Sequence, residues 1–404
     1  MSTMTAENRT AGRAAHRTGF WIVSAAFMTA MAFAAVPTPL YPIYEQRDGF
    51  PAYVITVVFA AYAVGVMLAL YLAGHVSDWL GRRRLVLASL AIQALAALLF
   101  LFWNDVSGLL LARFVSGAGI GTLTAAATAH LGELRKVSHP HEDGRVSGTV
   151  ASAVNLGGIA LGPLLGGVIA QFLPAPILTP FEVFLVIIVL AIVFLAFVPE
   201  TVDTVAARRP YAPQKVVVPP EARGAFIAAA IGAAAAFSVM GFFTALTASI
   251  VIGLLHLSGH LIAGVVAFAV TGASAVSQLA TARLARRAKL QLGVALMIAG
   301  LGLVAVVGFT PSLALLLVAG MLAGAGVGLV FSSSIAVAVA SAGPDNRGEV
   351  LSGMFLSAYA GLTVPVIAVG VALAFFPIAN VLTVFALAVL VIVVVTAIPS
   401  LRRH

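Results

Sequence analysis

The chain has no cysteine and few charged residues, since only 9% of its 404 residues are Asp, Glu, Lys or Arg. Without cysteine, disulfide bonds and thiolate-ligated metal sites are excluded. Soluble globular domains carry about 25% charged residues, whereas this chain is 61% hydrophobic. The shortage of charge therefore excludes an ordinary soluble domain and indicates that lipid surrounds most of the chain.

The apolar residues occur in long runs bounded by charged residues, proline or glycine. A helix that spans a membrane needs about 20 apolar residues, whereas strands of a membrane barrel are about ten residues long and alternate. The runs fit helices, so the sequence predicts an all-α polytopic membrane protein with twelve transmembrane helices. The expected spans are 20–42, 52–74, 85–103, 107–130, 147–172, 179–198, 224–254, 260–282, 290–309, 312–340, 348–376 and 378–398.

A polar stretch, 199–223, separates the sixth run from the seventh. It holds seven charged residues and several prolines, a composition that predicts a linker. The expected organisation is an N-terminal tail (1–19), a six-helix bundle (20–198), this linker, a second six-helix bundle (224–398) and a short tail (399–404).

The distribution of Lys and Arg predicts the orientation. With the N-terminus in the cytoplasm, 20 of the 22 Lys and Arg residues fall in cytoplasmic tails and loops. Cytoplasmic loops of membrane proteins carry this excess. Both termini are therefore expected in the cytoplasm, and the chain in the cytoplasmic (inner) cell membrane. The same pattern assigns the net charge of +8 to topology rather than to a nucleic-acid surface.

Short segments recur in the same order in both halves. The glycine-rich segment 117–121 recurs at 324–328, and Pro163 has a counterpart in Pro365. These repeats indicate a duplicated six-helix unit. Two such halves with a substrate path between them are an architecture of many secondary transporters.

A basic turn joins the second and third expected spans. It reads Gly74-His75-Val76-Ser77-Asp78-Trp79-Leu80-Gly81-Arg82-Arg83-Arg84. It resembles the G-x-x-x-D-x-x-G-[RK]-[RK] loop signature of the major facilitator superfamily. Gly74 and Gly81 permit a tight turn, Arg82 and Arg83 set the topology, and Asp78 is expected to accept hydrogen bonds that hold the cytoplasmic side closed. The alternative is a purely topogenic turn with a solvated aspartate.

The fourth expected span contains an arginine, Arg113. The segment from Arg113 to Gly121 is similar to the R-x-x-x-G-x-G signature of the same superfamily. A charge inside a span is costly and marks a functional hypothesis. In related families this arginine is tied to proton coupling or substrate charge, and the resemblance implies that role for Arg113. The alternative is an arginine that snorkels to the outer interface.

The fifth expected span, from Asn155 to Gly167, resembles the G-x-x-x-G-P-x-x-G-G signature of antiporter, export-type branches of the superfamily. Glycines at four-residue spacing lie on one helix face and permit close packing, and a proline favours a bend. The signature residues are Gly158, Gly162, Pro163, Gly166 and Gly167. The resemblance implies a twelve-span drug/proton antiporter.

Proton-coupled exporters of this kind commonly carry a carboxylate in the first span, but 20–42 has none. The remaining coupling candidates are Arg113, Asp78 and Glu182. For Glu182, a solvated carboxylate at a helix start is the alternative. No cofactor is expected, and the proton gradient is the expected energy source.

The candidates for a substrate cavity are polar and aromatic residues of the spans. They are Thr38, Tyr41, Tyr62, Asn155, Phe242, Phe243, Gln278 and Tyr359. A cavity with many apolar side chains and few charges suits a small amphipathic or neutral compound. The expected partners are this substrate, protons and the lipid bilayer, and the chain is expected to be a monomer that binds no nucleic acid.

The sequence therefore predicts a secondary active transporter that works by alternating access, with proton-coupled efflux of drugs or metabolites as the preferred function. A sugar or organic-acid facilitator or symporter, and a non-transporting membrane sensor, are the alternatives. No catalytic motif occurs, so no enzyme is expected. His256 and His260 lie near an outer loop without a neighbouring carboxylate, so no metal site is expected.

Overall fold

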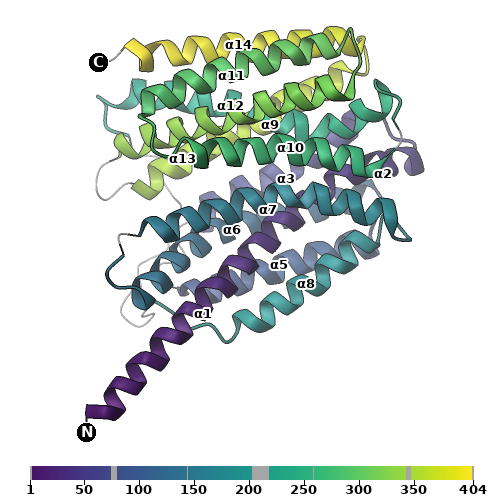
Figure 1. The fold of residues 1–404 in the computed structure, drawn as a ribbon. Coiled ribbons are helices and arrows are strands. Elements are labelled where there is room, and N and C mark those ends of the chain that lie inside the picture. Colours follow the sequence, from purple (N-terminus) through teal and green to yellow (C-terminus); the bar gives the residue numbers. More distant parts are fainter. Residues whose placement is uncertain are drawn as a thin grey trace.

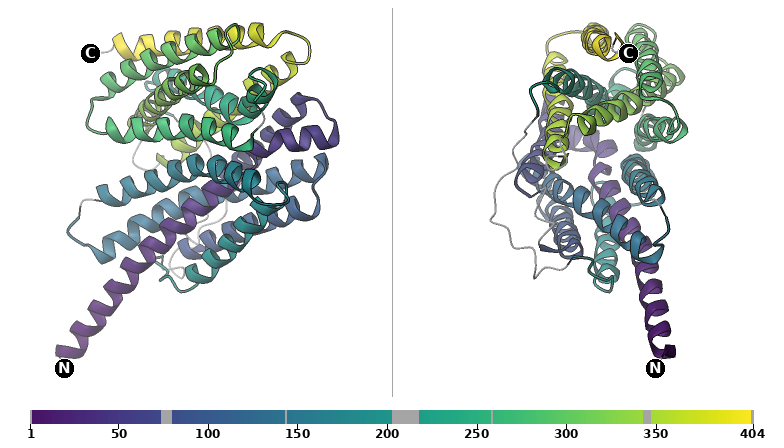
Figure 2. Two further views of the ribbon diagram at one scale, coloured as in Figure 1. Left: turned by 45° about the vertical axis from the view of Figure 1, so that its right-hand side comes forward. Right: turned by 90° about the vertical axis from the view of Figure 1, so that its left-hand side faces the viewer.

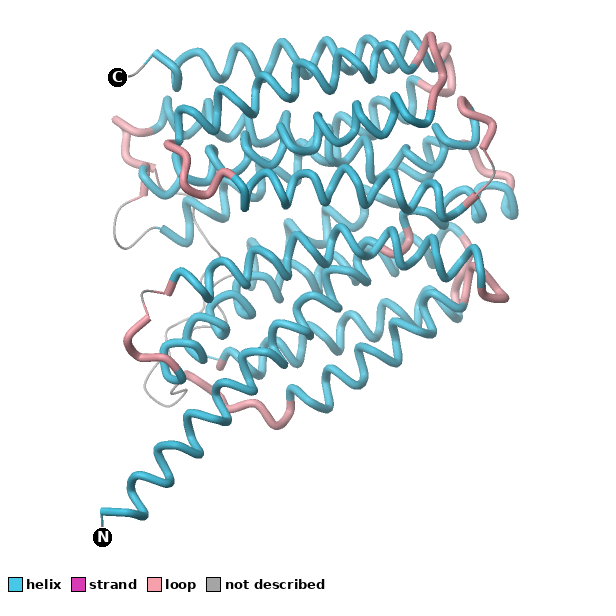
Figure 3. The backbone as a smooth tube through the Cα atoms, viewed as in Figure 1, coloured by secondary structure: helices cyan, strands magenta, loops and turns pink. Residues whose placement is uncertain are grey.

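The computed structural model describes residues 2–73, 80–142, 144–202, 218–257, 259–342 and 347–402, which form helices and loops without a strand (Figure 3). The helices of the first half are α1 (Ser2–Ala35), η1 (Thr38–Leu40), α2 (Tyr41–Asp48), α3 (Ala52–Ala73), α5 (Arg82–Phe102), α6 (Val106–Ser138), α7 (Arg145–Phe172) and α8 (Thr179–Leu195). Those of the second half are α9 (Arg223–Gly253), α10 (His260–Ala280), α11 (Arg286–Val307), α12 (Leu313–Ala340), α13 (Arg347–Ala372) and α14 (Ile378–Arg402).

Each predicted span has a long helix at its position, and the largest differences are at both ends of α1, which begins at Ser2, and at the end of α6. The first predicted span, 20–42, was wrong at its end, because α1 stops at Ala35. Pro37 and Pro39 lack the amide hydrogen that an α-helix needs, so the chain forms the short helix η1 before α2 begins. By contrast, α6 continues to Ser138, because its polar last turns form good helix outside the apolar run.

In the described part of the chain, eleven helical segments are long and apolar enough to cross a membrane, and α8, with 17 residues, is shorter. A helix of that length reaches about 26 Å, against a hydrocarbon core of about 30 Å. Both chain ends lie at the same end of the helices (Figures 1 and 2). If both ends lie on the same side of the membrane, the chain crosses it an even number of times. This agrees with counting α8 as the twelfth span, and the number of twelve spans stays a prediction.

The helices form two bundles, each with an apolar core. Figure 1 shows α1 to α8 in the lower bundle and α9 to α14 in the upper one. In the first core the rings of Phe100 and Phe181 stack with centroids 4.3 Å apart. In the second, Phe242 and Phe385 stack at 4.8 Å. The limits of the linker stay a prediction, since 203–217 lie outside the described residues.

The glycine repeat makes equivalent contacts in the two bundles. Gly117 of α6 faces the backbone carbonyl of Tyr62 on α3, and Gly324 of α12 faces that of Val270 on α10. In both places a Cβ would overlap the carbonyl oxygen. Only glycine permits such an approach of two helix backbones, so the sequence repeat corresponds to a repeated helix pair.

Replacement of Gly324 tests this contact. We expect Gly324→Ala to lower the free energy of unfolding by about 1–3 kcal/mol, the usual cost of overpacking, because the new methyl group overlaps the Val270 carbonyl. The measurement is thermal unfolding of the purified protein in detergent. The matched control is Gly302→Ala, at an exposed α11 position with no atom near its Cβ, which helix propensity should stabilise slightly. Equal effects of the two changes would contradict the prediction.

Candidate functional site

Helix α7 presents its glycine face to α1. A Cβ at Gly158 would lie 2.6 Å from the carbonyl oxygen of Met28, and one at Gly166 would lie 2.6 Å from that of Val36. Gly162 stands between them and faces the carbonyl of Ala32 in the same way. The regular spacing therefore brings the backbones of α7 and α1 into direct contact over two helical turns.

The other side of α7 contacts the second bundle. A Cβ at Gly167 would lie 2.6 Å from the carbonyl oxygen of His260, and one at Gly264 of α10 would lie 2.5 Å from that of Pro163. The amide of His260 also donates a hydrogen bond to Oε1 of Gln171, at 3.1 Å. The glycine and proline segment of α7 thus lies where the two bundles meet, and we name this contact the α7–α10 seam.

A second seam joins α3 to α13. A Cβ at Gly370 would lie 3.0 Å from the Cβ of Thr56. Deeper along the same helices, Tyr62 and Tyr359 are close enough for their hydroxyl groups to interact. The glycine contacts of both seams occur at the helix ends opposite to the chain termini.

Arg113 is buried next to the α3–α13 seam, with only 1% of its surface exposed. Its Nε donates a hydrogen bond to the hydroxyl of Tyr41 at 2.6 Å, and its Nη1 donates to the carbonyl of Ala34 at 2.5 Å. The guanidinium also lies over the rings of Tyr41 and Tyr62, at 5.2 and 5.7 Å from their centroids. Arg113 therefore does not snorkel to the interface, and the alternative interpretation of this residue was wrong.

No carboxylate pairs with Arg113 among the described residues. The ion pairs found there are Arg47 with Asp48, Arg82 with Glu133, and Arg135 with Glu142, all near helix ends. Burial of a charge costs several kcal/mol unless a counter-ion or hydrogen bonds compensate it. The tyrosine contacts compensate Arg113 in part, while its Nη2 is buried without a partner.

The remaining predicted cavity residues have different surroundings. Thr38 is buried in η1. Phe242 and Phe243 are fully buried in the core of the second bundle, so in this conformation they pack against other side chains and face no open path. Asn155 and Gln278 are half-buried on α7 and α10.

The two predicted coupling carboxylates have different outcomes. Glu182 is exposed in the first turn of α8, where the helix dipole favours a negative charge. This position matches the alternative that we gave for it. Asp78, together with Gly74 of the same loop signature, lies outside the described residues.

The remaining residues of the loop signature begin α5, and Glu200 caps this helix. Gly81 has φ 104°, a left-handed conformation that favours glycine. Oε1 of Glu200 accepts hydrogen bonds from the backbone amides of Arg82, at 2.9 Å, and Arg83, at 3.3 Å. The guanidinium of Arg83 donates to the carbonyl of Val198 at 2.9 Å. The basic turn is thus tied to the chain that leaves α8.

Two residues of α6 extend this cluster. Glu133 pairs with Nε of Arg82 at 3.2 Å and also bonds to the hydroxyl of Thr201. Nε2 of His130 lies 3.1 Å from the carbonyl of Pro199, so this nitrogen carries the proton. Sequence analysis missed Glu200, although its place directly after the sixth apolar run was a signal that it lies beside the basic turn.

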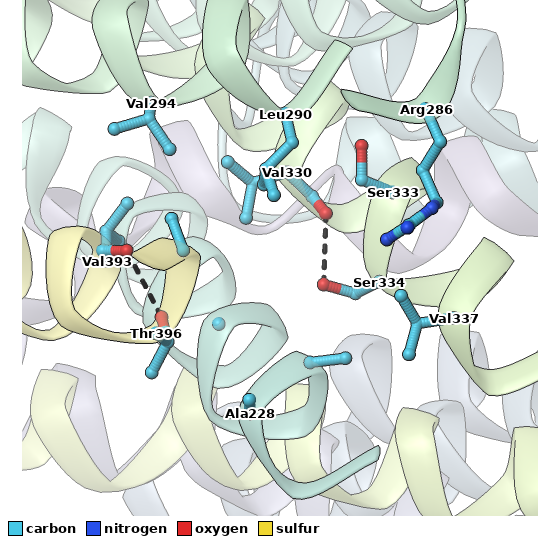
Figure 4. A pocket seen from close by; sticks show the side chains of 13 residues that line it. Ala228, Arg286, Leu290, Val294, Val330, Ser333, Ser334, Val337, Val393 and Thr396 are labelled. Carbon is cyan, nitrogen blue, oxygen red and sulfur yellow. Dashed lines mark hydrogen bonds between the residues drawn. The ribbon is translucent and has the colours of Figure 1, made fainter. Parts of the chain in front are cut away.

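A small cavity of about 20 Å³ lies within the second bundle, between α9, α11, α12 and α14 (Figure 4). In its wall Ser334 donates a hydrogen bond to the carbonyl of Val330, and Thr396 donates to that of Val393. A polar cavity of this size holds about one water molecule. Substrate pockets are larger, at about 300–1,000 Å³, so we place no substrate there.

Comparison with known proteins shows the family of this chain and a solved structure with a similar fold. Residues 22–364 match the family model described as Major Facilitator Superfamily. No curated protein matches the chain. Among solved structures, the crystal structure of the human organic anion transporter MFSD10 (TETRAN) matches with a TM-score of 0.67 and 16% identity, covering 94% of this chain and 99% of that chain. At this identity the likeness shows a shared fold.

The carboxylate cap of α5 predicts a pH-dependent stability. Burial raises the pKa of Glu200, but hydrogen bonds from the amides of Thr201, Arg83 and Val202 outweigh it and leave the pKa below its ordinary value. A lowered pKa in the folded state means that Glu200 stabilises the fold above the ordinary pKa of about 4.3. This contribution is lost as the pH falls through the lowered value.

We therefore expect Glu200→Gln to destabilise the protein at pH 7 by about 1 kcal/mol, the usual cost of a lost helix cap, reduced by solvent screening because Glu200 is half-exposed. The difference from wild type should shrink as the pH falls below the ordinary pKa of about 4.3 and vanish only below the lowered pKa of Glu200. Thermal unfolding between pH 3.5 and 8 measures it, with the exposed Glu221→Gln as a control that shows no change. A constant difference across this range would show that Glu200 acts without its charge.

Proposed function

This chain belongs to the major facilitator superfamily and is a multi-pass membrane transporter rather than an enzyme, and on that premise we propose that it exports small amphipathic or neutral compounds by proton-coupled alternating access. The observation that carries the proposal is the position of α7. Its glycine and proline segment contacts α1 of its own bundle and α10 of the other. Helices that meet through backbone and glycine have no interlocking side chains, and such a contact separates with little repacking.

We assign the described conformation to one of the two main states of an alternating-access cycle. With both termini in the cytoplasm, as the distribution of Lys and Arg predicts, the α7–α10 and α3–α13 seams close the outer side. We propose that this is the inward-facing state and that both seams open to release substrate outside. We also propose that the chain has twelve spans, lies in the cytoplasmic membrane and works as a monomer.

We propose Arg113 and Asp78 as the coupling residues. Arg113 contacts Tyr62, which belongs to the α3–α13 seam, so opening of the seam changes the surroundings of the guanidinium. An unpaired positive charge lowers the proton affinity of nearby groups. The changing exposure of Arg113 thereby links proton binding to the opening of the α3–α13 seam. Glu182 is the weaker candidate, because it is exposed at the start of α8.

A second candidate function is transport of organic acids without proton antiport. No Asp or Glu is among the fully buried residues of the described chain, so a proton-carrying carboxylate inside the membrane is missing there. A buried arginine without a counter-ion also suits an acidic substrate. One structural match is to a protein named as an organic anion transporter.

Transport assays in liposomes distinguish these functions. We expect amphipathic substrates to dissipate an imposed pH gradient with wild-type protein. Arg113→Ala should reduce this response at least tenfold, because the coupling charge is gone. Arg113→Lys, which keeps the charge and loses the planar contacts, should retain part of it. The exposed Glu221→Gln serves as control. Transport of organic acids that ignores the pH gradient would favour the second function over the first.

Cross-linking tests the role of the α3–α13 seam. The chain has no native cysteine, and a Cβ at position 370 lies 3.0 Å from that of Thr56, near the separation of about 3.8 Å in disulfides. We expect oxidation of the double variant Thr56→Cys/Gly370→Cys to abolish transport and reduction to restore it. The single variant Thr56→Cys should transport under both conditions. Full transport by the cross-linked protein would mean that this seam does not open.

A further inference from the structure

The hydrogen-bond donors around Arg113 outnumber the acceptors. A guanidinium has five N–H donors, and those of Nη2 are buried without an acceptor. The hydroxyl of Tyr44, on a side chain with 0% exposure, is also buried without a partner. The hydroxyl of Tyr41 accepts the hydrogen bond from Nε of Arg113, so its own proton remains available to a further acceptor. Two buried donor groups, Nη2 of Arg113 and the hydroxyl of Tyr44, therefore lack an acceptor.

These donors belong to one place in the fold. Tyr41 and Tyr44 stand three residues apart on α2, a spacing that puts two side chains on the same helix face. The hydrogen bond to Tyr41 ties Arg113 to this face, and the guanidinium of Arg47 lies 5.2 Å from the ring centroid of Tyr44. Tyr41, Tyr44 and Arg113 are among the largest fully buried side chains of the described residues. The donor group is therefore a preformed interior cluster that does not depend on flexible surface side chains.

The guanidinium of Arg113 also lacks a counter-charge among the described residues. No ion pair joins Arg113 to a carboxylate within the described residues, and buried donors without acceptors are destabilising. A water molecule accepts hydrogen bonds but leaves the charge unpaired. A monovalent anion supplies both the acceptor and the counter-charge. A divalent anion would leave an excess negative charge in a medium of low dielectric constant.

We propose that Arg113, Tyr41 and Tyr44 form a buried binding site for one small monovalent anion, either chloride or the carboxylate group of an organic acid. As a chloride site it adds an ion to the transport cycle. If the site binds a carboxylate group, the substrates are organic acids, and this part of the inference rests on the proposed transport function.

The position of the site links the anion to conformation. Helix α2 carries both tyrosines and follows directly after η1. Both helices pack against α9 of the second bundle, and η1 also packs against α10. Arg113 in addition contacts Tyr62 of the α3–α13 seam. An anion held between Arg113 and the tyrosines therefore stabilises the state in which the outer side is closed, by mass action on that state.

The first experiment measures binding without transport. Purified protein in sulfate buffer is titrated with sodium chloride or sodium benzoate at constant ionic strength, and the melting temperature is followed. We expect a saturable rise with at least one of the two monovalent anions. Tyr44→Phe, which removes only the unpartnered hydroxyl, should fold normally and require about tenfold more anion, as one lost hydrogen bond predicts.

The exposed Tyr53→Phe is the matched control and should titrate like wild type. A response to chloride alone assigns a halide site, and a response to benzoate alone assigns a carboxylate site. No saturable rise with either anion, or titrations that Tyr44→Phe leaves unchanged, would overturn the proposal. Because no proton gradient is used, this result is independent of the liposome assay, so a failure of the anion site and a failure of proton-coupled export are distinguishable.

Discussion

Direct contact between helix backbones through glycine is the constraint on which the rest of this structure depends. Gly158 and Gly166 bring α7 onto α1, and Gly167 brings it onto α10. Within each bundle, glycines of the repeated segment do the same for α6 with α3 and for α12 with α10. In lipid, where apolar side chains gain little by leaving the solvent, close packing of this kind supplies much of the helix association. The same kind of residue thus forms the contacts within each bundle and the contact between the bundles at α7 and α10.

Most of the fold could be predicted from the sequence because its determinants are local. Long apolar runs specify helices, charged turns divide them, and glycine at four-residue spacing marks a packing face. The break after Ala35 was missed because hydropathy continues through Pro37 and Pro39, whose effect is on backbone hydrogen bonding.

The candidate site was less predictable, because it depends on contacts between distant segments. Phe242 and Phe243 were predicted in a substrate cavity because they are aromatic. Aromatic residues occur both in apolar cores and along substrate paths, and the structure places these two in a core. Arg113 was found from its cost in a membrane, whereas its contact with Tyr41 joins residues 72 apart. The partners of a buried charge follow from tertiary packing, which no local pattern records.

The contact of Glu200 with the start of α5 has a consequence for biosynthesis. The capping carboxylate lies 118 residues after the amide of Arg82, so the free amides of this helix end obtain this acceptor only when the ribosome has passed residue 200. At that point every helix of the first bundle has been made and no helix of the second has begun. This end of the first bundle can therefore close before the second bundle is complete.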